Sequence, residues 1–336
     1  MPRLAATQTP LYTALGKPGV RVAFRLEKIL REFELADTSV TRKGNHVFDA
    51  VAMDPAGHAT HFTRRIMSFE EPWTGSVIVM NDTRVIGSGE DPRPFYWSGS
   101  PCISAVTFSP DHGYINKIYI QAQDRWLPVI FRDGKSGGKN WMPFVRDDDL
   151  FFVHEFSPFR ILKAEYIHEN DGFLVARTVA EHKVRLPRSH DKYPWLRGGS
   201  NAVQIGRVIL GMGHTNEQPG KTFADIRHRP FLFVYRPGES LDYLTMEYPF
   251  DEAFRIIDPT SLYIRDGMLF LITSETERAW SVAPQKGRTC LYSIDISAEP
   301  DESGFGFRGR RLHRWTSGQD AQGRGVLGAW RRHKGA

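Results

Sequence analysis

The chain has 336 residues, enough to bury a large core as one large β domain or two smaller ones. An apolar share of 40% is that of a globular protein, and a net charge of only +5, with Lys and Arg scattered, does not indicate a nucleic-acid-binding surface. Two cysteines, Cys102 and Cys290, exclude a disulfide framework and favour a reducing compartment.

The sequence carries no sign of a membrane segment. Residues 1–19 lack an apolar core of signal-peptide length, and no later stretch is long enough to span a bilayer. We therefore expect a soluble, cytoplasmic protein with no nucleic-acid partner and no membrane span. The oligomeric state stays open, with a homo-oligomer among the alternatives.

The first segment with a clear pattern is 20–34, which follows a polar leader. Its apolar residues Leu26, Ile29, Leu30 and Phe33 recur at helical spacing, with charged residues between them. The segment is either an N-terminal helix or a strand that leads into one, and the pattern does not decide between the two. A polar link over 37–45 follows it.

One pattern then recurs five times along the chain. A polar residue enters a β-rich segment, a turn containing Gly, Pro or Asp follows, and a second β-rich segment runs back. The five stretches are 48–64, 90–108, 140–155, 197–214 and 257–275. Their polar entry residues, called the anchor residues below, are Asp49, Asp91, Asn140, Ser200 and Asp258.

The spacing of the anchor residues, roughly 40 to 60 positions, is typical of propeller blades. We predict an all-β protein, a five-bladed β-propeller with a short N-terminal extension, in which the innermost strands place the anchor residues around one end of a central channel. Ordinary hairpins of a β-sandwich are the alternative. The expected division is an extension over 1–44, a catalytic propeller over 45–317 and a basic tail over 318–336.

Four blocks of residues give the pattern a specific resemblance. They are Glu90-Asp91-Pro92-Arg93, then Lys139-Asn140-Trp141-Met142-Pro143-Phe144, then Ser157-Pro158 with Ile161-Leu162, and last Arg197-Gly198-Gly199-Ser200 with His214. In this order they resemble glycoside hydrolase family 130, the family of β-mannoside phosphorylases and some mannosidases, and the related β-mannosyltransferases. The resemblance implies a five-bladed β-propeller that acts on sugars.

The sequence departs from that family in three of the five stretches. Asp49-Ala50-Val51 stands where the family carries Asn-Pro-Ser, and the residues after Ser200 and around Glu275 differ as well. These departures leave the sugar, and the choice between phosphorolysis and glycosyl transfer, open.

Asp91 is the candidate catalytic residue. A carboxyl among apolar strand ends, beside a second carboxylate, has a raised pKa and can donate a proton to a glycosidic oxygen. In the resembled family the matching Asp is the proton donor and acts through a sugar hydroxyl. The alternative is a turn residue paired with Arg93.

A phosphorylase also needs cations for its phosphate, because Arg and Lys bind phosphate oxygens. The phosphate-binding candidates are Lys139, His154, Arg197 and His214, of which the resemblance implies Lys139 and His214. An exposed loop lysine and packing histidines are the alternatives. The candidates for sugar binding are Asp49, Arg64, Glu90, Arg93, Asn140, Asp258 and Glu275.

No cofactor or metal motif occurs in the sequence, and the run Asp147-Asp148-Asp149 fits a solvated hairpin turn. We expect no cofactor and no metal. Trp97, Trp141, Trp195 and Trp280 lie near the motif blocks, as sugar platforms or as packing. Three functions stay open. They are an inverting phosphorylase using inorganic phosphate on a β-mannoside or similar oligosaccharide, a glycosyltransferase using a sugar phosphate or nucleotide sugar, and a non-catalytic carbohydrate-binding propeller.

Overall fold

The computed structural model describes most of the chain. The described residues are 21–35, 45–68, 75–133, 138–167, 172–182, 188–190, 193–194, 196–217, 225–238, 240–245, 250–279, 285–297 and 310–316. The leader 1–17, Trp195, Trp280 and the basic tail 318–336 lie outside them. All regular structure in this part of the chain is β, apart from one 3₁₀ turn at Gln121–Gln123.

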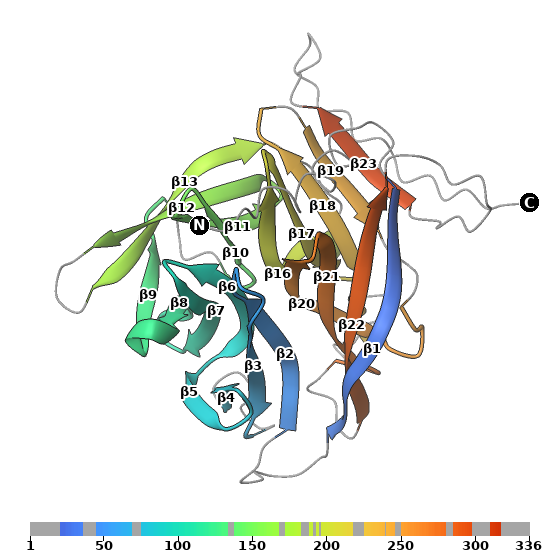
Figure 1. The fold of residues 1–336 in the computed structure, drawn as a ribbon, viewed down its shortest axis with the longest axis horizontal. Helices are drawn as coiled ribbons and strands as arrows, with labels where there is room; N and C mark the ends of the chain where they lie inside the picture. Colours follow the sequence, from blue (N-terminus) through green and yellow to red (C-terminus); the bar gives the residue numbers. More distant parts are fainter. Residues whose placement is uncertain are drawn as a thin grey trace, which may run out of the picture.

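Each of the five repeated stretches forms an antiparallel hairpin, and each hairpin is the inner strand pair of one blade of a five-bladed β-propeller (Figure 1). The sequence prediction of the fold is confirmed. The hairpins are β2(Asn45–Met53) with β3(Ala59–Ile66), β6(Glu90–Trp97) with β7(Ser100–Ser109), β10(Met142–Arg146) with β11(Asp149–Phe156), β16(Leu196–Ile205) with β17(Val208–Thr215), and β20(Ile256–Arg265) with β21(Met268–Thr276).

Outer strands complete the blades. They are β4(Ser76–Met80) and β5(Arg84–Ser88) in the first blade, β8(Gly113–Ile120) and β9(Arg125–Phe131) in the second, β12(Phe159–Ile167) and β13(Phe173–His182) in the third, β18(Pro230–Arg236), β19(Ser240–Thr245) and β23(Arg310–Thr316) in the fourth, and β22(Gln285–Ser297) in the fifth. Parallel pairing of β13 with β9 joins the second and third blades into one sheet. The short strands β14(Arg188–His190) and β15(Tyr193–Pro194) pair with each other.

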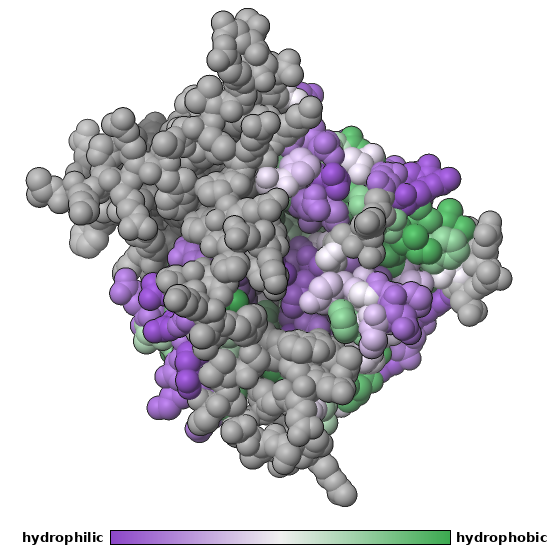
Figure 2. Space-filling view, turned by 180° about the vertical axis from the view of Figure 1, so that it is seen from behind, coloured by the Kyte–Doolittle hydropathy of each residue, from purple (hydrophilic) through white to green (hydrophobic). Residues whose placement is uncertain are grey.

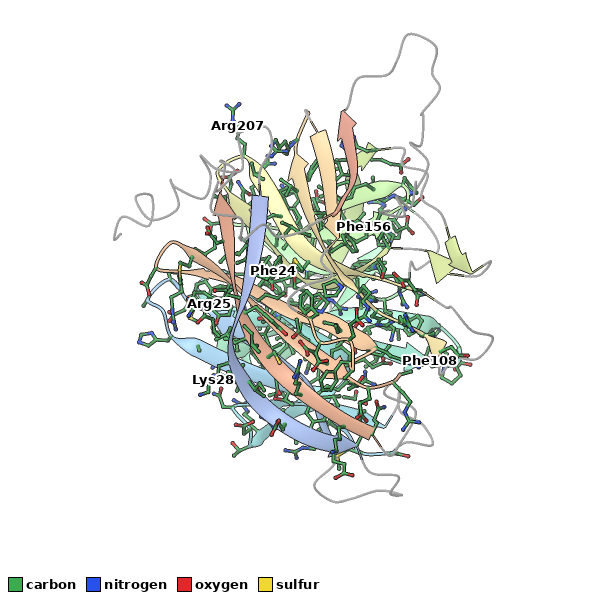
Figure 3. The ribbon with its side chains drawn as sticks, turned by 90° about the vertical axis from the view of Figure 1, so that its right-hand side faces the viewer. Phe24, Arg25, Lys28, Phe108, Phe156 and Arg207 are labelled. Carbon is green, nitrogen blue, oxygen red and sulfur yellow. The ribbon has the colours of Figure 1, made fainter. Side chains whose placement is uncertain are left out.

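The segment predicted as a helix, or as a strand leading into one, is a strand throughout, β1(Arg21–Leu35), which pairs with β22 as the outermost strand of the fifth blade (Figure 3). The expectation of a helix is wrong. Irregularities after Leu26 and after Ile29 break the two-residue alternation of an ordinary strand. This explains the helix-like spacing of apolar residues. Leu26, Ile29 and Leu30 are about 40% exposed, while Phe24 packs into the core.

The inner strands close a ring, because β2, β6, β10, β16 and β20 each contact the next and β20 contacts β2. Each gap between neighbouring blades holds an apolar cluster, and these clusters are the core of the protein. Representative residues are Phe62 and Ile103 between blades one and two, Ile118 and Phe152 between two and three, Phe144 and Phe231 between three and four, Leu210 and Leu271 between four and five, and Leu35 and Val47 between five and one.

Polar side chains on the inner strands also fasten neighbouring blades to each other. The Asn201 side chain donates to the carbonyl oxygen of Leu262 and accepts from its N–H, both at 2.8 Å, which links β16 to β20. Ser261 binds the N–H and the carbonyl oxygen of Val51 in the same way, at 3.0 and 2.7 Å, which links β20 to β2. Backbone groups that face a neighbouring blade thus keep hydrogen-bond partners.

Replacing Asn201 by Ala tests how much these hydrogen bonds between blades contribute to stability. The change leaves two buried backbone groups of Leu262 unpaired, so we expect a loss of about 2–4 kcal/mol in the free energy of unfolding, measured by urea denaturation. Gln204→Ala is the matched control, since Gln204 donates only to Gly206 within its own turn, and it should change stability by less than about 0.5 kcal/mol. Equal losses in the two variants would contradict a role for Asn201 between blades.

The surface seen from the side opposite to Figure 1 is mainly hydrophilic where it is described, with apolar side chains gathered mostly near one edge (Figure 2). Among the described residues, no helix has the length and apolar character needed to cross a membrane. The run of three aspartates lies in the tight turn between β10 and β11, where Asp147 and Asp148 have positive φ angles of 51° and 64°. The prediction of a hairpin turn at this place is confirmed.

Candidate active site

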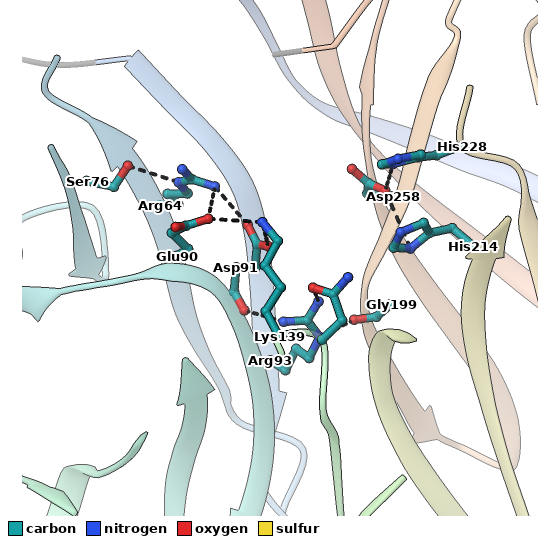
Figure 4. A network of polar contacts seen from close by, with 11 residues as sticks. Arg64, Ser76, Glu90, Asp91, Arg93, Lys139, Gly199, His214, His228 and Asp258 are labelled. Atoms are coloured by element: carbon teal, nitrogen blue, oxygen red, sulfur yellow. Dashed lines mark hydrogen bonds and ion pairs between the residues drawn. The ribbon is translucent and has the colours of Figure 1, made fainter. Parts of the chain in front are cut away.

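Backbone irregularities lie beside the anchor residues. The pairing of the inner hairpins shifts register at Val47/Asp49, Glu90/Arg93, Gly198/Ala202 and Pro259/Ser261. Asp91 and Asn140 themselves have positive φ angles of 49° and 74°. Bulges and left-handed residues redirect side chains out of the regular alternation of a strand. Here they accompany a polar group drawn from several blades (Figure 4).

The first part of this group consists of two carboxylates and two cations, Glu90, Asp91, Arg64 and Lys139, called the ion-pair group below. Arg64 donates from Nη1 to Asp91 Oδ1 at 2.8 Å and from Nε to Ser76 Oγ at 3.0 Å. Lys139 Nζ lies 3.2 Å from Glu90 Oε2 and 3.6 Å from Asp91 Oδ2. The side chains of Arg64 and Glu90 are 0% and 1% exposed, so these charges are shielded from water.

The state of Asp91 differs from the sequence prediction. Burial alone would raise its pKa, but the charges of Lys139, Arg64 and Arg93 outweigh burial and hold the pKa of Asp91 well below its usual range. The expectation of a raised pKa is wrong for the free protein, because the sequence argument counted the neighbouring carboxylate and not these three cations. Asp91 is an ionised carboxylate as long as these three cations stay beside it.

Arg93 is buried and holds three blades together. It donates to the carbonyl oxygen of Gly199 at 2.6 Å, to Asn140 Oδ1 at 2.9 Å and to the carbonyl oxygen of Asp91 at 2.9 Å. Gly198 in the same strand as Gly199 packs so closely on the backbone of Asn140 that a Cβ would not fit. The motif residues Arg93, Asn140 and Gly198 therefore meet in space, and their common effect is to shape the polar end of the ring.

The second part of the group is the histidine corner, formed by His214, His228 and Asp258. His228 Nδ1 lies 2.7 Å from Asp258 Oδ1, and His214 Nδ1 lies 3.6 Å from the same oxygen. The two imidazole rings stack with centroids 4.3 Å apart. His214 is on β17 and Asp258 on β20, while His228 precedes β18, so the corner joins the fourth and fifth blades.

His214 is 4% exposed, and neither ring nitrogen has a hydrogen-bond partner among the described residues. Its burial, His228, and the positive charges of Arg197, Arg93 and Lys139 place its pKa well below the ordinary value of histidine. The ring is therefore neutral at pH 7. A buried ring whose nitrogens form no hydrogen bond among the described residues is a candidate for binding a ligand in the corner.

The three residues of the histidine corner also offer two imidazole nitrogens and one carboxylate oxygen within 4.8 Å of one another, a donor set that transition metals accept. The surrounding charges argue for a different ligand. Arg93, Arg197 and Lys139 all act on His214 with positive charge. These three cations oppose a divalent cation, against the attraction of the Asp258 carboxylate. We assign no metal to the corner.

Three predicted site residues make their contacts elsewhere, two through their polar groups and one through its ring. Asp49 accepts from Thr63 and Thr289 at 2.6 Å each, which ties the first blade to the fifth. Glu275 is fully buried and bound by Arg288 Nε at 2.8 Å and the Tyr292 hydroxyl at 2.7 Å.

His154 is the third of these residues, and its ring lies in aromatic packing. Its centroid is 4.8 Å from that of Trp141 and 4.9 Å from that of Phe131. This is the packing arrangement that the sequence left as an alternative to phosphate binding. The roles predicted for Asp49, Glu275 and His154 stay predictions.

Sequence reasoning missed His228. It lies in Arg227-His228-Arg229-Pro230, just before the third strand of its blade, whereas the repeat pattern covered only the first two strands of each blade. A charged cluster directly before the apolar run 231–235 was the available signal.

In comparisons with known proteins, this chain is similar to others in structure and not in sequence. No family model matches the sequence. A search of curated proteins likewise finds no match. A protein of Parabacteroides distasonis assigned provisionally as a glycoside hydrolase has a similar structure, with a TM-score of 0.52 and 10% identity over 86% of this chain and 99% of the other. That likeness supports the propeller fold.

Two proteins of Leishmania mexicana are also similar in structure. One is a GDP-Man-dependent mannosyltransferase, with a TM-score of 0.47 and 14% identity over 85% of this chain and 94% of the other. The other is a mannose phosphorylase in complex with a phosphate ion, with a TM-score of 0.47 and 11% identity over 78% of this chain and 88% of the other.

Proposed function

We propose that this protein is an inverting glycoside phosphorylase that acts on β-mannosides or similar β-linked oligosaccharides. The observation that carries the proposal is the buried, neutral ring of His214, whose nitrogens form no hydrogen bond among the described residues and on which the positive charges of Arg197, Arg93 and Lys139 act. Such a place suits the oxygens of phosphate, since His and the basic side chains supply donors and charge.

The ion-pair group lies beside this anion site and supplies the carboxyl that the chemistry needs. Phosphate attacks the anomeric carbon, the glycosidic C–O bond breaks, and the leaving oxygen takes a proton through a sugar hydroxyl from Asp91, which must first take up that proton from solvent. A phosphorylase needs no second carboxylate as a base, because phosphate is itself an anionic nucleophile. Attack from the face opposite the leaving group inverts the anomeric centre, so a β-linked substrate gives an α-sugar 1-phosphate.

A second candidate function is a glycosyltransferase that moves a sugar from a sugar phosphate or nucleotide sugar to an acceptor hydroxyl. One observation favours it, namely that Lys139, Arg64 and Arg93 hold Asp91 ionised. A carboxylate that is already ionised can accept the proton of an acceptor hydroxyl, as transfer requires. The anion site would then hold the phosphate of the donor.

The two candidates differ in the donor that they use. We expect the purified protein to release inorganic phosphate when it is incubated with a sugar 1-phosphate and a manno-oligosaccharide acceptor, and to leave nucleotide sugars intact. Release of nucleoside diphosphate from a nucleotide sugar, with no reaction of the sugar 1-phosphates, would replace the phosphorylase by the transferase. A panel of donors in each class, analysed for both released groups and for the extended glycan, gives the answer in one experiment.

A further inference from the structure

The ion-pair group is balanced in charge and almost sealed from water. Glu90 and Asp91 contribute two negative charges, and Arg64 and Lys139 contribute two positive ones. Their side chains are 1%, 9%, 0% and 18% exposed. Uncompensated charge is costly at such depth, so the group resists any change that leaves it with a net charge.

The two cations of this group are held differently. Arg64 is fully buried and bonded to Ser76 and Asp91 at 3.0 and 2.8 Å. Lys139 lies at the edge of the group, 3.2 and 3.6 Å from its two carboxylates, distances longer than those of a tight charge-assisted bond. A lysine also carries its charge on a flexible stem. Lys139 is therefore the member of the group that can leave it.

In the close-up of the polar network the Lys139 side chain lies between the carboxylate pair and the histidine corner (Figure 4), and its positive charge acts on His214. An anion bound against His214 attracts Lys139 in competition with Glu90 and Asp91. If Lys139 moves, Arg64 is the cation that remains, among the described residues, in direct contact with the carboxylate oxygens of Glu90 and Asp91. Arg93 bonds to the backbone oxygen of Asp91. Two neighbouring carboxylates that share too little positive charge do not both stay ionised, and one of them takes up a proton.

We propose that an anion bound in the histidine corner draws Lys139 away from Glu90 and Asp91, and that this carboxylate pair takes up one proton in exchange. The inference rests on the proposed function, since it concerns the same anion. The proton comes from solvent, and it restores the charge balance that the departure of Lys139 disturbs. No other covalent change is involved.

This exchange explains how an ionised Asp91 and an acid role are compatible. In the free protein the pair carries no proton, so it cannot protonate a glycosidic oxygen. With phosphate bound, the pair carries the one proton that the leaving oxygen needs. The acid is thus loaded only when the nucleophile is present, which protects a bound glycoside from hydrolysis in the absence of phosphate.

Calorimetric titration with sulfate at about pH 6 measures the proton uptake directly. Sulfate resembles phosphate and does not itself titrate near neutral pH, so any proton that is taken up goes to the protein. The slope of the observed binding enthalpy against the ionisation enthalpy of several buffers gives the number of protons. We expect about one proton per bound sulfate in the unmodified protein, as one charge is displaced.

Three variants locate the proton. In Lys139→Met the carboxylate pair has no movable cation to lose, so sulfate should bind more weakly and without proton uptake. In Glu90→Gln and in Asp91→Asn only one carboxylate of the pair is left, and Arg64 balances its charge. Sulfate should therefore bind to both variants without proton uptake. Lys163→Met is the matched control, because Lys163 pairs with Asp149 on the outer part of its blade at 2.6 Å, and it should keep the full uptake.

Three results would overturn the inference. Proton uptake that persists in both Glu90→Gln and Asp91→Asn would place the proton on the imidazole of His214 instead. Sulfate binding without proton uptake in the unmodified protein would show that Lys139 stays with its carboxylates, while the proposed phosphorylase would stand. Absence of sulfate binding together with absence of phosphorolysis would remove both proposals. If one carboxyl variant fails to fold, the other still decides.

Discussion

Replacing Asp91 by Asn is expected to lower turnover on an unactivated β-mannoside by about 10²–10⁴-fold, the usual share of general acid catalysis. Asn keeps the shape of the side chain and tolerates the left-handed backbone at this position, where φ is 49°. Sugar affinity should change little, because the amide still forms hydrogen bonds. Initial rates across a range of substrate concentrations separate the effect on turnover from an effect on binding.

Two controls make the result for Asp91 specific. Asp266→Asn is the matched variant, since Asp266 also has a positive φ of 51° but its side chain is 90% exposed in a turn, and it should leave turnover unchanged. A nitrophenyl glycoside, whose leaving group needs no proton, should partly restore the rate of Asp91→Asn. Full activity of Asp91→Asn on the unactivated substrate would show that the acid lies elsewhere.

Replacing Arg64 by Met is expected to have the largest effect on stability, a loss of about 3–5 kcal/mol in the free energy of unfolding. Arg64 is fully buried, and its removal leaves Glu90 and Asp91 with less positive charge in a place that water does not reach. Chemical denaturation at pH 7 measures the loss. A loss below about 1 kcal/mol would mean that the pairing contributes no more than a surface salt bridge.

The destabilisation by Arg64→Met should also depend on pH in a defined direction. The pKa of Asp91 is lower in the folded protein than in the unfolded chain, so its ionisation stabilises the fold above about pH 4 and this contribution disappears as the pH falls further. The difference between the unmodified protein and Arg64→Met should therefore shrink on acidification. A double variant with Glu90→Gln should be less destabilised than Arg64→Met alone, because it buries one negative charge fewer.

The inner hairpins could be predicted from the sequence because the signals for strand, turn and strand lie next to one another in the chain. A turn such as Asp147-Asp148 lies between two β-rich segments, and the anchor residue stands at the entry. The strand β1 could not be predicted in this way. Its irregular pairing with β22, at least 250 positions away, removes the alternation by which a strand is recognised.

Which residues lie together in the polar region was easier to predict from the sequence than the protonation state of Asp91. Asp91, Lys139, Arg93 and His214 do fall into one polar region. The protonation state of Asp91 depends on Arg64, which is 27 positions away and reaches it only through the pairing of blades. A local sequence pattern does not show that Arg64 contacts Asp91. An argument from each residue and its sequence neighbours therefore predicts the wrong direction for the pKa shift of Asp91.

Phosphorus NMR of the protein with inorganic phosphate and a β-linked manno-oligosaccharide tests the proposed chemistry most directly. We expect the phosphate signal to be replaced by that of an α-sugar 1-phosphate, with the reaction absent when phosphate is withheld and lost in Asp91→Asn. Release of free mannose at the same rate with and without phosphate, and no sugar phosphate, would contradict the phosphorylase and identify a hydrolase on the same propeller.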